Sequence, residues 1–116
     1  MAGPDLPFSI RHHGMVMCNS NQTIYIIGGI QDGSISKDTW TVNVRDLKKY
    51  LEDPSHVCLF EKGPPLNQER FKLTCGSCSV DEKSRLVVAG GNDMAYTLST
   101  VEYLDPDSNH GWKVGM

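Results

Sequence analysis

Cys75 and Cys78 have the spacing that most directly suggests chemistry, because C-x-x-C is used by zinc sites and by thioredoxin-like redox sites. A structural zinc site needs a second pair of ligands, and a redox pair needs a helix N-terminus that stabilises the thiolate. The sequence offers neither context around this pair. On a strand, residues i and i+3 also point to opposite faces. We therefore interpret both cysteines as small structural residues of a core.

His12 and His13 are the next candidates, in this case as metal ligands. No Asp, Glu or Cys stands at ligand spacing from them, and adjacent strand residues face opposite ways, so we expect no metal site. The sequence contains no nucleophile elbow, phosphate-binding loop or His-Glu-x-x-His motif, and Gly28 and Gly29 lack the spacing of a dinucleotide fingerprint. We accordingly expect no catalytic residue, no cofactor and no enzymatic activity.

The composition indicates one globular domain. The 116 residues are 39% apolar and 22% charged, with a formal net charge of -3. Because no basic run is longer than Lys48 and Lys49, we expect no nucleic-acid binding. No stretch approaches the roughly 18 to 20 apolar residues of a membrane span, and the N-terminus lacks signal-peptide character, so we expect a cytoplasmic protein without membrane contact.

Two segments of the chain have the same internal order. In each, a segment that begins at an arginine, Arg11 or Arg70, leads through a polar turn into an apolar run and then a glycine pair, Gly28 and Gly29 or Gly90 and Gly91. A polar loop, an alternating strand, an Asp (Asp46 or Asp105) and a bulky aromatic residue follow in both copies. The second copy starts about 60 residues after the first, which is the signature of a repeat architecture.

The residue types predict that each copy is a four-stranded antiparallel sheet, and that the fold is all-β. The apolar runs before the glycine pairs are rich in β-branched residues and suit inner strands. Val42 and Val44 alternate with polar residues, as in a strand nearer the solvent. Residues 1–10 then lead into a first unit at 11–66 and a second unit at 67–116.

The first copy carries an insert after its third strand, at residues 47–54. Leu47, Tyr50 and Leu51 recur at helical spacing behind a possible cap at Asp46, and Pro54 ends the segment. We expect a single helical turn here, exposed to solvent.

These features together resemble the kelch repeat, a β-propeller blade of about 50 residues. The resemblance is carried by the strand that ends at Gly28 and Gly29, and by the run from Val101 to the Asp105-Pro106 turn with Trp112 after it. It implies that the chain forms two kelch blades. Propellers use about 4 to 8 blades, so the chain is expected either to be a fragment of a larger propeller or to close a ring by homo-oligomerisation.

The resemblance also implies where a partner binds. In similar kelch proteins, a partner protein or peptide docks at one end of the ring, on the loop after each glycine pair and on the segment that enters each blade. By position, this assigns the following partner-binding residues: His13, Gln31, Asp32, Ser34, Ser36, Arg70, Lys72, Asn92, Asp93 and Tyr96. Arg11 and Arg70 have a second interpretation, in which they brace adjacent blades.

The predicted function is therefore a protein-protein interaction module. Similarity to kelch-like adaptors implies recognition of substrates for a ubiquitin ligase, with the cullin reached only through a BTB domain that these residues do not contain. Actin binding is an alternative within the family. An alternative from another class is a kelch-fold enzyme such as a copper oxidase, for which Tyr25, His13 and Tyr103 form no clear cluster.

Overall fold

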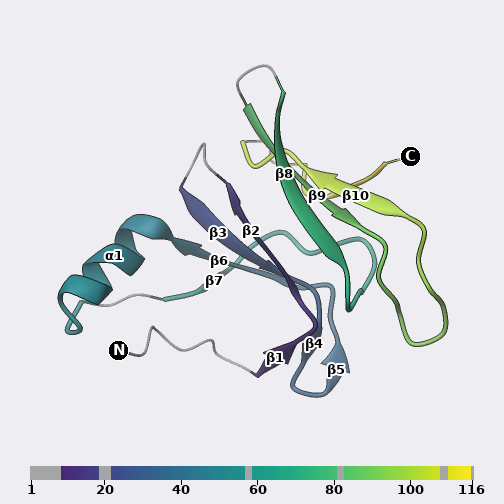
Figure 1. Ribbon diagram of the computed structural model, residues 1–116, viewed down its shortest axis with the longest axis horizontal. Coiled ribbons are helices and arrows are strands. Elements are labelled where there is room, and N and C mark those ends of the chain that lie inside the picture. The colour runs from purple at the N-terminus through teal and green to yellow at the C-terminus, as the bar shows by residue number, and fades with distance from the viewer. Residues whose placement is uncertain (1–8, 19–21, 57–58, 81–82, 108–109, 116) are drawn as a thin grey trace.

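The computed structural model describes residues 9–18, 22–56, 59–80, 83–107 and 110–115, and these residues are mostly antiparallel β-structure (Figure 1). Two four-stranded sheets dominate, which confirms the predicted all-β class. The first sheet has the order β2-β3-β6-β7, with β2 at Gly14–Cys18, β3 at Thr23–Ile27, β6 at Thr39–Asn43 and β7 at Glu61–Lys62. The second has the order β8-β9-β10-β11, with β8 at Thr74–Val80, β9 at Lys83–Ala89, β10 at Val101–Leu104 and β11 at Lys113–Gly115.

A small three-stranded sheet lies beside the first sheet, beyond the ends of β2 and β3 (Figure 1). Its order is β1-β4-β5, with β1 at Ile10–Arg11, β4 at Ile30–Gln31 and β5 at Ser34–Ile35. Gly28 and Gly29 separate β3 from β4 at φ angles of 62° and 85°, and Gly90 and Gly91 follow β9 at 64° and 87°. Glycine adopts this left-handed region without steric penalty, so the paired glycines allow each chain turn out of the sheet.

The insert of the first copy is a longer helix than the sequence predicted. Helix α1 runs over Val44–Glu52, nine residues in place of the single turn, and it begins before Asp46. Asn43 is the N-cap, because its extended backbone leaves its side-chain oxygen free to accept from the N–H groups of Arg45 at 2.8 Å and Asp46 at 3.4 Å. Val44, predicted to end the strand, therefore opens the helix.

The two large sheets pack face to face around one shared core (Figure 1). The first sheet contributes Tyr25 and Ile27 to it, and the second contributes Leu86, Val88 and Leu104. Further buried members of this cluster are Cys18, Leu66, Leu73 and Trp112. Burial of apolar surface contributes about 25 cal/mol per Å², so this core is the main stabilising element of the fold.

The two copies repeat the same backbone hydrogen bonds, which fixes how their residues correspond. Gly28 N–H donates to Asp38 and Gly90 N–H donates to Thr100, while Ser36 and Leu98 N–H donate to Gly29 and Gly91. Counted from these bonds, Ile27 corresponds to Ala89 and Asp38 to Thr100.

This register corrects the sequence alignment of the two copies. Arg11 was aligned with Arg70, but Arg11 pairs with Ile30 directly after the first glycine pair, whereas Phe71 pairs with Asn92 after the second. Arg11 therefore corresponds to Phe71, and Ile10 corresponds to Arg70. By the same count Asp105 corresponds to the helix cap Asn43 and not to Asp46.

Candidate functional site

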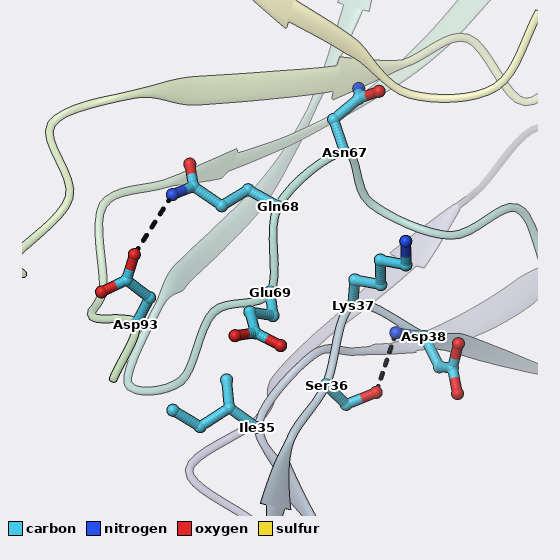
Figure 2. Close-up of a pocket in the computed structure, with 8 residues that line it drawn as sticks. All are labelled: Ile35, Ser36, Lys37, Asp38, Asn67, Gln68, Glu69 and Asp93. Atoms are coloured by element: carbon cyan, nitrogen blue, oxygen red, sulfur yellow. Dashed lines mark hydrogen bonds between the residues drawn. The ribbon is translucent and has the colours of Figure 1, made fainter. Parts of the chain in front are cut away.

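The loops after the two glycine pairs meet at one end of the molecule, around an open hollow of 530 Å³ (Figure 2). Ser36 lies on the first loop and Asp93 on the second, and the connection between the two sheets passes between them. The residues that line this loop-end hollow are Ile35, Ser36, Lys37, Asp38, Asn67, Gln68, Glu69 and Asp93. The structure thus brings together Ser36 and Asp93, two of the predicted partner-binding residues.

Backbone hydrogen bonds hold the walls of the loop-end hollow in place. The connecting segment donates from Leu66 N–H to the Lys37 carbonyl at 2.7 Å and from Arg70 N–H to the Ser36 carbonyl at 3.3 Å. In the opposite direction, Gly29 N–H donates to the Arg70 carbonyl at 2.6 Å. The hollow is therefore built on paired backbone, which suits a preformed binding surface.

A second hollow of 370 Å³ adjoins the first and shares Ile35, Ser36 and Asp38 with it. The predicted residues Gln31, Asp32 and Ser34 line this second hollow, together with Trp40. Five of the ten predicted binding residues therefore line two adjoining hollows, with Ser36 common to both.

Carboxylates dominate the charge of the loop-end hollow. Asp38, Glu69 and Asp93 line it, against the single cation of Lys37. Lys62 lies 3.6 Å from Asp38 and offsets part of this charge from outside the lining. The N–H groups of Ala95 and Tyr96 donate to Asp93 and hold the pKa of its carboxyl below the ordinary value, so this carboxylate stays ionised.

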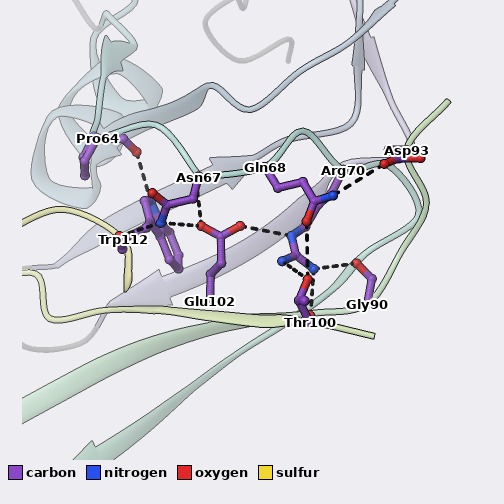
Figure 3. A network of polar contacts seen from close by, with 9 residues as sticks. All are labelled: Pro64, Asn67, Gln68, Arg70, Gly90, Asp93, Thr100, Glu102 and Trp112. Carbon is purple, nitrogen blue, oxygen red and sulfur yellow. Dashed lines mark hydrogen bonds and ion pairs between the residues drawn. The ribbon is translucent and has the colours of Figure 1, made fainter. Parts of the chain in front are cut away.

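Arg70 was predicted to contact a partner, and the structure corrects this placement. Its side chain is completely buried behind the hollow and forms an ion pair with Glu102, also completely buried, with Nε to Oε2 at 3.2 Å (Figure 3). The guanidinium also donates to the carbonyls of Gly90 and Thr100 at 3.0 and 2.8 Å. Arg70 therefore joins the connecting segment to the second sheet. Its side-chain partners all lie within the second unit, so the side chain does not brace the two units against each other, contrary to the alternative interpretation.

The same buried network reaches the wall of the hollow and the core. Glu102 accepts from the backbone N–H of Asn67 at 2.6 Å and from its side-chain amide at 3.0 Å. The Asn67 amide also donates to the Trp112 carbonyl, and the Trp112 indole donates to Pro64 at 3.0 Å (Figure 3). Gln68 donates to Asp93 at 3.4 Å. Glu102 of the buried ion pair thus positions the lining residue Asn67, whereas Gln68 bonds to the lining residue Asp93.

The remaining predicted binding residues lie outside the lining of both hollows. His13 and Lys72 are exposed on the segments that enter the two large sheets, and Tyr96 is 74% exposed at the tip of the second loop. Asn92 is half-buried, because it bridges to Phe71 and accepts from the Thr97 hydroxyl at 3.2 Å. These four residues lie on the second loop and on the two entering segments, and they do not line a common pocket.

The cysteine and histidine motifs have different environments. Cys75 packs against the core, and burial raises the pKa of its thiol to about 12. Cys78 was predicted to be a core residue and is instead exposed, because one face of the edge strand β8 is open. His12 and His13 are exposed. Across the described ranges, no three His, Cys, Asp or Glu side chains gather in a way that could hold a metal ion.

Sequence reasoning missed Glu102 and the lining residues of the connecting segment. The available signal was alternation, since Glu102 and Leu104 share one face of β10 and Leu104 is a core residue. An acidic residue on the core face of a strand requires a buried partner, and Arg70 provides it. Asn67, Gln68 and Glu69 carried no comparable signal.

No helix among the described residues is long and apolar enough to span a bilayer. No family model matches the chain. The chain is similar to the catalytic subunit of DNA polymerase epsilon from Aspergillus fumigatus, at 35% identity over 75 residues. That match spans 64% of this chain and 3% of the length of the polymerase protein. The similarity therefore concerns a small fraction of the relative and does not show a family.

Proposed function

We propose that this chain is a kelch-type protein-interaction module that binds a partner protein or peptide at its loop end. One observation carries the proposal: loops from two repeated sheets converge on a hollow of 530 Å³ whose walls are held by backbone hydrogen bonds. Rigid sheets that present variable loops are a common way to build a binding surface. The resemblance to kelch-like adaptors further suggests that the partner is a substrate presented to a ubiquitin ligase.

The charges of the hollow indicate which segment fits. Asp38, Glu69 and Asp93 favour a lysine or arginine side chain, because a cation gains charge-assisted hydrogen bonds to carboxylates. Ile35 adds an apolar contact for the stem of such a side chain. We therefore propose a basic, extended peptide segment as the ligand, in place of the acidic partner that an exposed Arg70 would have favoured.

A displayed library of random peptides, selected on the immobilised chain, tests this function. We expect the selected peptides to be enriched in Lys and Arg, and to bind Glu69→Lys at least about tenfold more weakly, which corresponds to about 1.4 kcal/mol. Glu52→Lys is the matched control, since Glu52 is an exposed residue at the end of α1 and its reversal makes the same change in net charge. Equal weakening by both variants, or selection of peptides without basic residues, contradicts the proposal.

A further inference from the structure

The contact between the two large sheets joins unlike faces. Tyr25 and Ile27 lie on the face of the first sheet that meets the shared core. The second sheet contributes Leu86 and Val88 to that core, and these two residues lie on the face that is not equivalent to the Tyr25 face. In the common register Tyr25 corresponds to Val87 and Ile27 to Ala89, each one residue away from Leu86 or Val88. The interface within the chain is therefore head-to-tail.

The outer face of the second sheet repeats the face that the first sheet buries. Successive strand residues alternate between faces, so Val87 and Ala89 lie opposite the core residues Leu86 and Val88. Val101 and Tyr103 are their cross-strand neighbours on β10, and Gly76 is the neighbour of Val87 on β8. None of these five is buried, whereas Tyr25 and Ile27 are. The second sheet thus presents a partly exposed copy of a docking face, on which Arg85 lies over the Tyr103 ring at 4.8 Å.

The outer face of the first sheet repeats the face that docks. Ile24, Ile26 and Val42 correspond to Leu86, Val88 and Leu104, which pack against the first sheet within the chain. Met15 and Met17 are their cross-strand neighbours on β2 and are 65% and 37% exposed. Ile26 and Val42 are already buried within the chain and Ile24 is half-buried, so the two methionines supply the exposed, adaptable apolar area of this face.

The backbone around the second sheet also repeats an interface. At the first sheet, the Gly29 N–H and the carbonyls of His12, Ser36 and Lys37 bond to the connecting segment. Their counterparts at the second sheet are the Gly91 N–H and the carbonyls of Lys72, Leu98 and Ser99. Within the part of the chain that the structure describes, these four groups have no hydrogen bond.

A second copy of this chain carries the segment that would complete these bonds. Ile10 and His12 occupy the positions of Arg70 and Lys72, and His12 and Lys72 share the same left-handed backbone, with φ of 55° and 56°. The Ile10 and His12 backbone of one copy can therefore bond to Gly91, Leu98 and Lys72 of another, as Arg70 and Lys72 bond to Gly29, Ser36 and His12 within the chain.

We propose that copies of this chain associate head-to-tail, with the outer face of the first sheet of one copy docked on the outer face of the second sheet of the next. Such a heterologous contact closes a ring when its rotation divides a full turn and otherwise extends as a filament. The surface involved is separate from the loop-end hollow, so this inference goes beyond the proposed function and is tested without any peptide.

The test uses one blocking substitution on each face and the solution mass from light scattering. Met15→Glu places a charge on the outer face of the first sheet at an exposed position. Gly76→Glu does the same on the second sheet, where an added Cβ atom meets no other atom within 4 Å. Met94→Glu, at a loop residue that is 84% exposed, is the matched control. Circular dichroism verifies that all three variants retain the β-sheet spectrum.

We expect the unmodified chain and Met94→Glu to form a discrete oligomer or a filament, and each face variant alone to be monomeric. Mixing the two face variants leaves one intact face on each, so the mixture should give a 1:1 dimer and nothing larger. A monomeric unmodified chain at all concentrations overturns the proposal. A mixture that stays monomeric also overturns the proposal. A face variant that still assembles by itself overturns it as well, because its one intact face could then only contact the same face of another copy.

Discussion

The buried carboxylate of Glu102 accepts a hydrogen bond from the buried guanidinium of Arg70 at 3.2 Å, and this ion pair joins the segment between the two sheets to the second sheet. Removal of one partner of a buried pair leaves an uncompensated charge. We therefore expect Glu102→Ala to lower the free energy of unfolding by about 3 to 5 kcal/mol in urea denaturation. Arg85→Ala is the control, because its ion pair with Asp105 is partly exposed and screened by solvent, so its removal should destabilise the chain far less than Glu102→Ala. Similar losses in both variants would refute the structural role of Glu102.

The side chain of Trp112 contributes apolar burial and one hydrogen bond, and two substitutions separate these contributions. Trp112→Ala should lower the free energy of unfolding by about 3 to 5 kcal/mol, because it leaves a cavity beside Leu104 in the core. Trp112→Phe keeps most of the packing but loses the indole donor to the Pro64 carbonyl, so we expect a loss of about 1 to 2 kcal/mol. Denaturant melts followed by far-ultraviolet dichroism measure both. A negligible effect of Trp112→Ala would mean that the end of the second sheet does not pack as described.

The strands before the glycine pairs could be predicted because their local signals agree. The apolar run that includes Tyr25 and Ile27 suits an inner strand, and the glycines after it adopt positive φ as paired glycines often do. The all-β class and the two four-stranded sheets followed from this agreement. The helix was underestimated because either Asn43 or Asp46 could serve as its cap, and only backbone geometry decides between them.

The binding residues could be predicted in part, since loop position follows from the glycine pairs while side-chain direction does not. Ser36 and Asp93 lie where their loops were expected. Arg70 was misplaced because arginine is rarely buried, and its partner Glu102 stands 32 residues away in the sequence. The Arg11 and Arg70 alignment failed for a related reason: residue type suggested it, but the hydrogen bonds beside the glycine pairs set the register.

Gly14 on β2 lies directly against Cys75 on β8. A Cβ atom at position 14 would overlap the Cys75 sulfur, although Gly14 does not have a positive φ. We expect Gly14→Ala to destabilise the chain by about 1 to 3 kcal/mol through overpacking. Cys75→Ala should remove most of this penalty in the double variant, so a double-mutant cycle should give a coupling of at least about 1 kcal/mol.

The matched control for this cycle is Gly76→Ala, on the same strand as Cys75. An added Cβ there meets nothing within 4 Å, so its effect on stability should be within about 0.5 kcal/mol. Additive effects of Gly14→Ala and Cys75→Ala would show that the two strands lie farther apart than described.

The Asp93 carboxylate fixes the second loop by accepting from Ala95 N–H at 2.8 Å and Tyr96 N–H at 2.7 Å. These bonds hold the pKa of Asp93 below its ordinary value of 3.8 in the folded state. The ionised carboxylate therefore stabilises the loop fully at pH values above the pKa that Asp93 has in the unfolded chain. As pH falls through the lowered pKa, the carboxyl is protonated and this stabilisation is lost. We expect the amide resonances of Ala95 and Tyr96 to titrate with a pKa below 3.8, and not to titrate this way in Asp93→Asn. A pKa at or above 3.8 contradicts the loop geometry.

Cys75 and Cys78 should differ strongly in reactivity although two residues separate them. Burial raises the pKa of the Cys75 thiol to about 12, so almost none of it is thiolate at pH 8, whereas Cys78 is exposed on the open face of β8. In the Met15→Glu variant, whose second sheet is not covered by another copy, a pulse of iodoacetamide at pH 8 followed by peptide mass mapping should modify Cys78 at least about 100-fold faster than Cys75. In urea, where the fold is lost, the two rates should converge within about threefold. Equal rates in the native chain would place Cys75 outside the core, and would remove the close contact with Gly14 on which the packing of the two sheets depends.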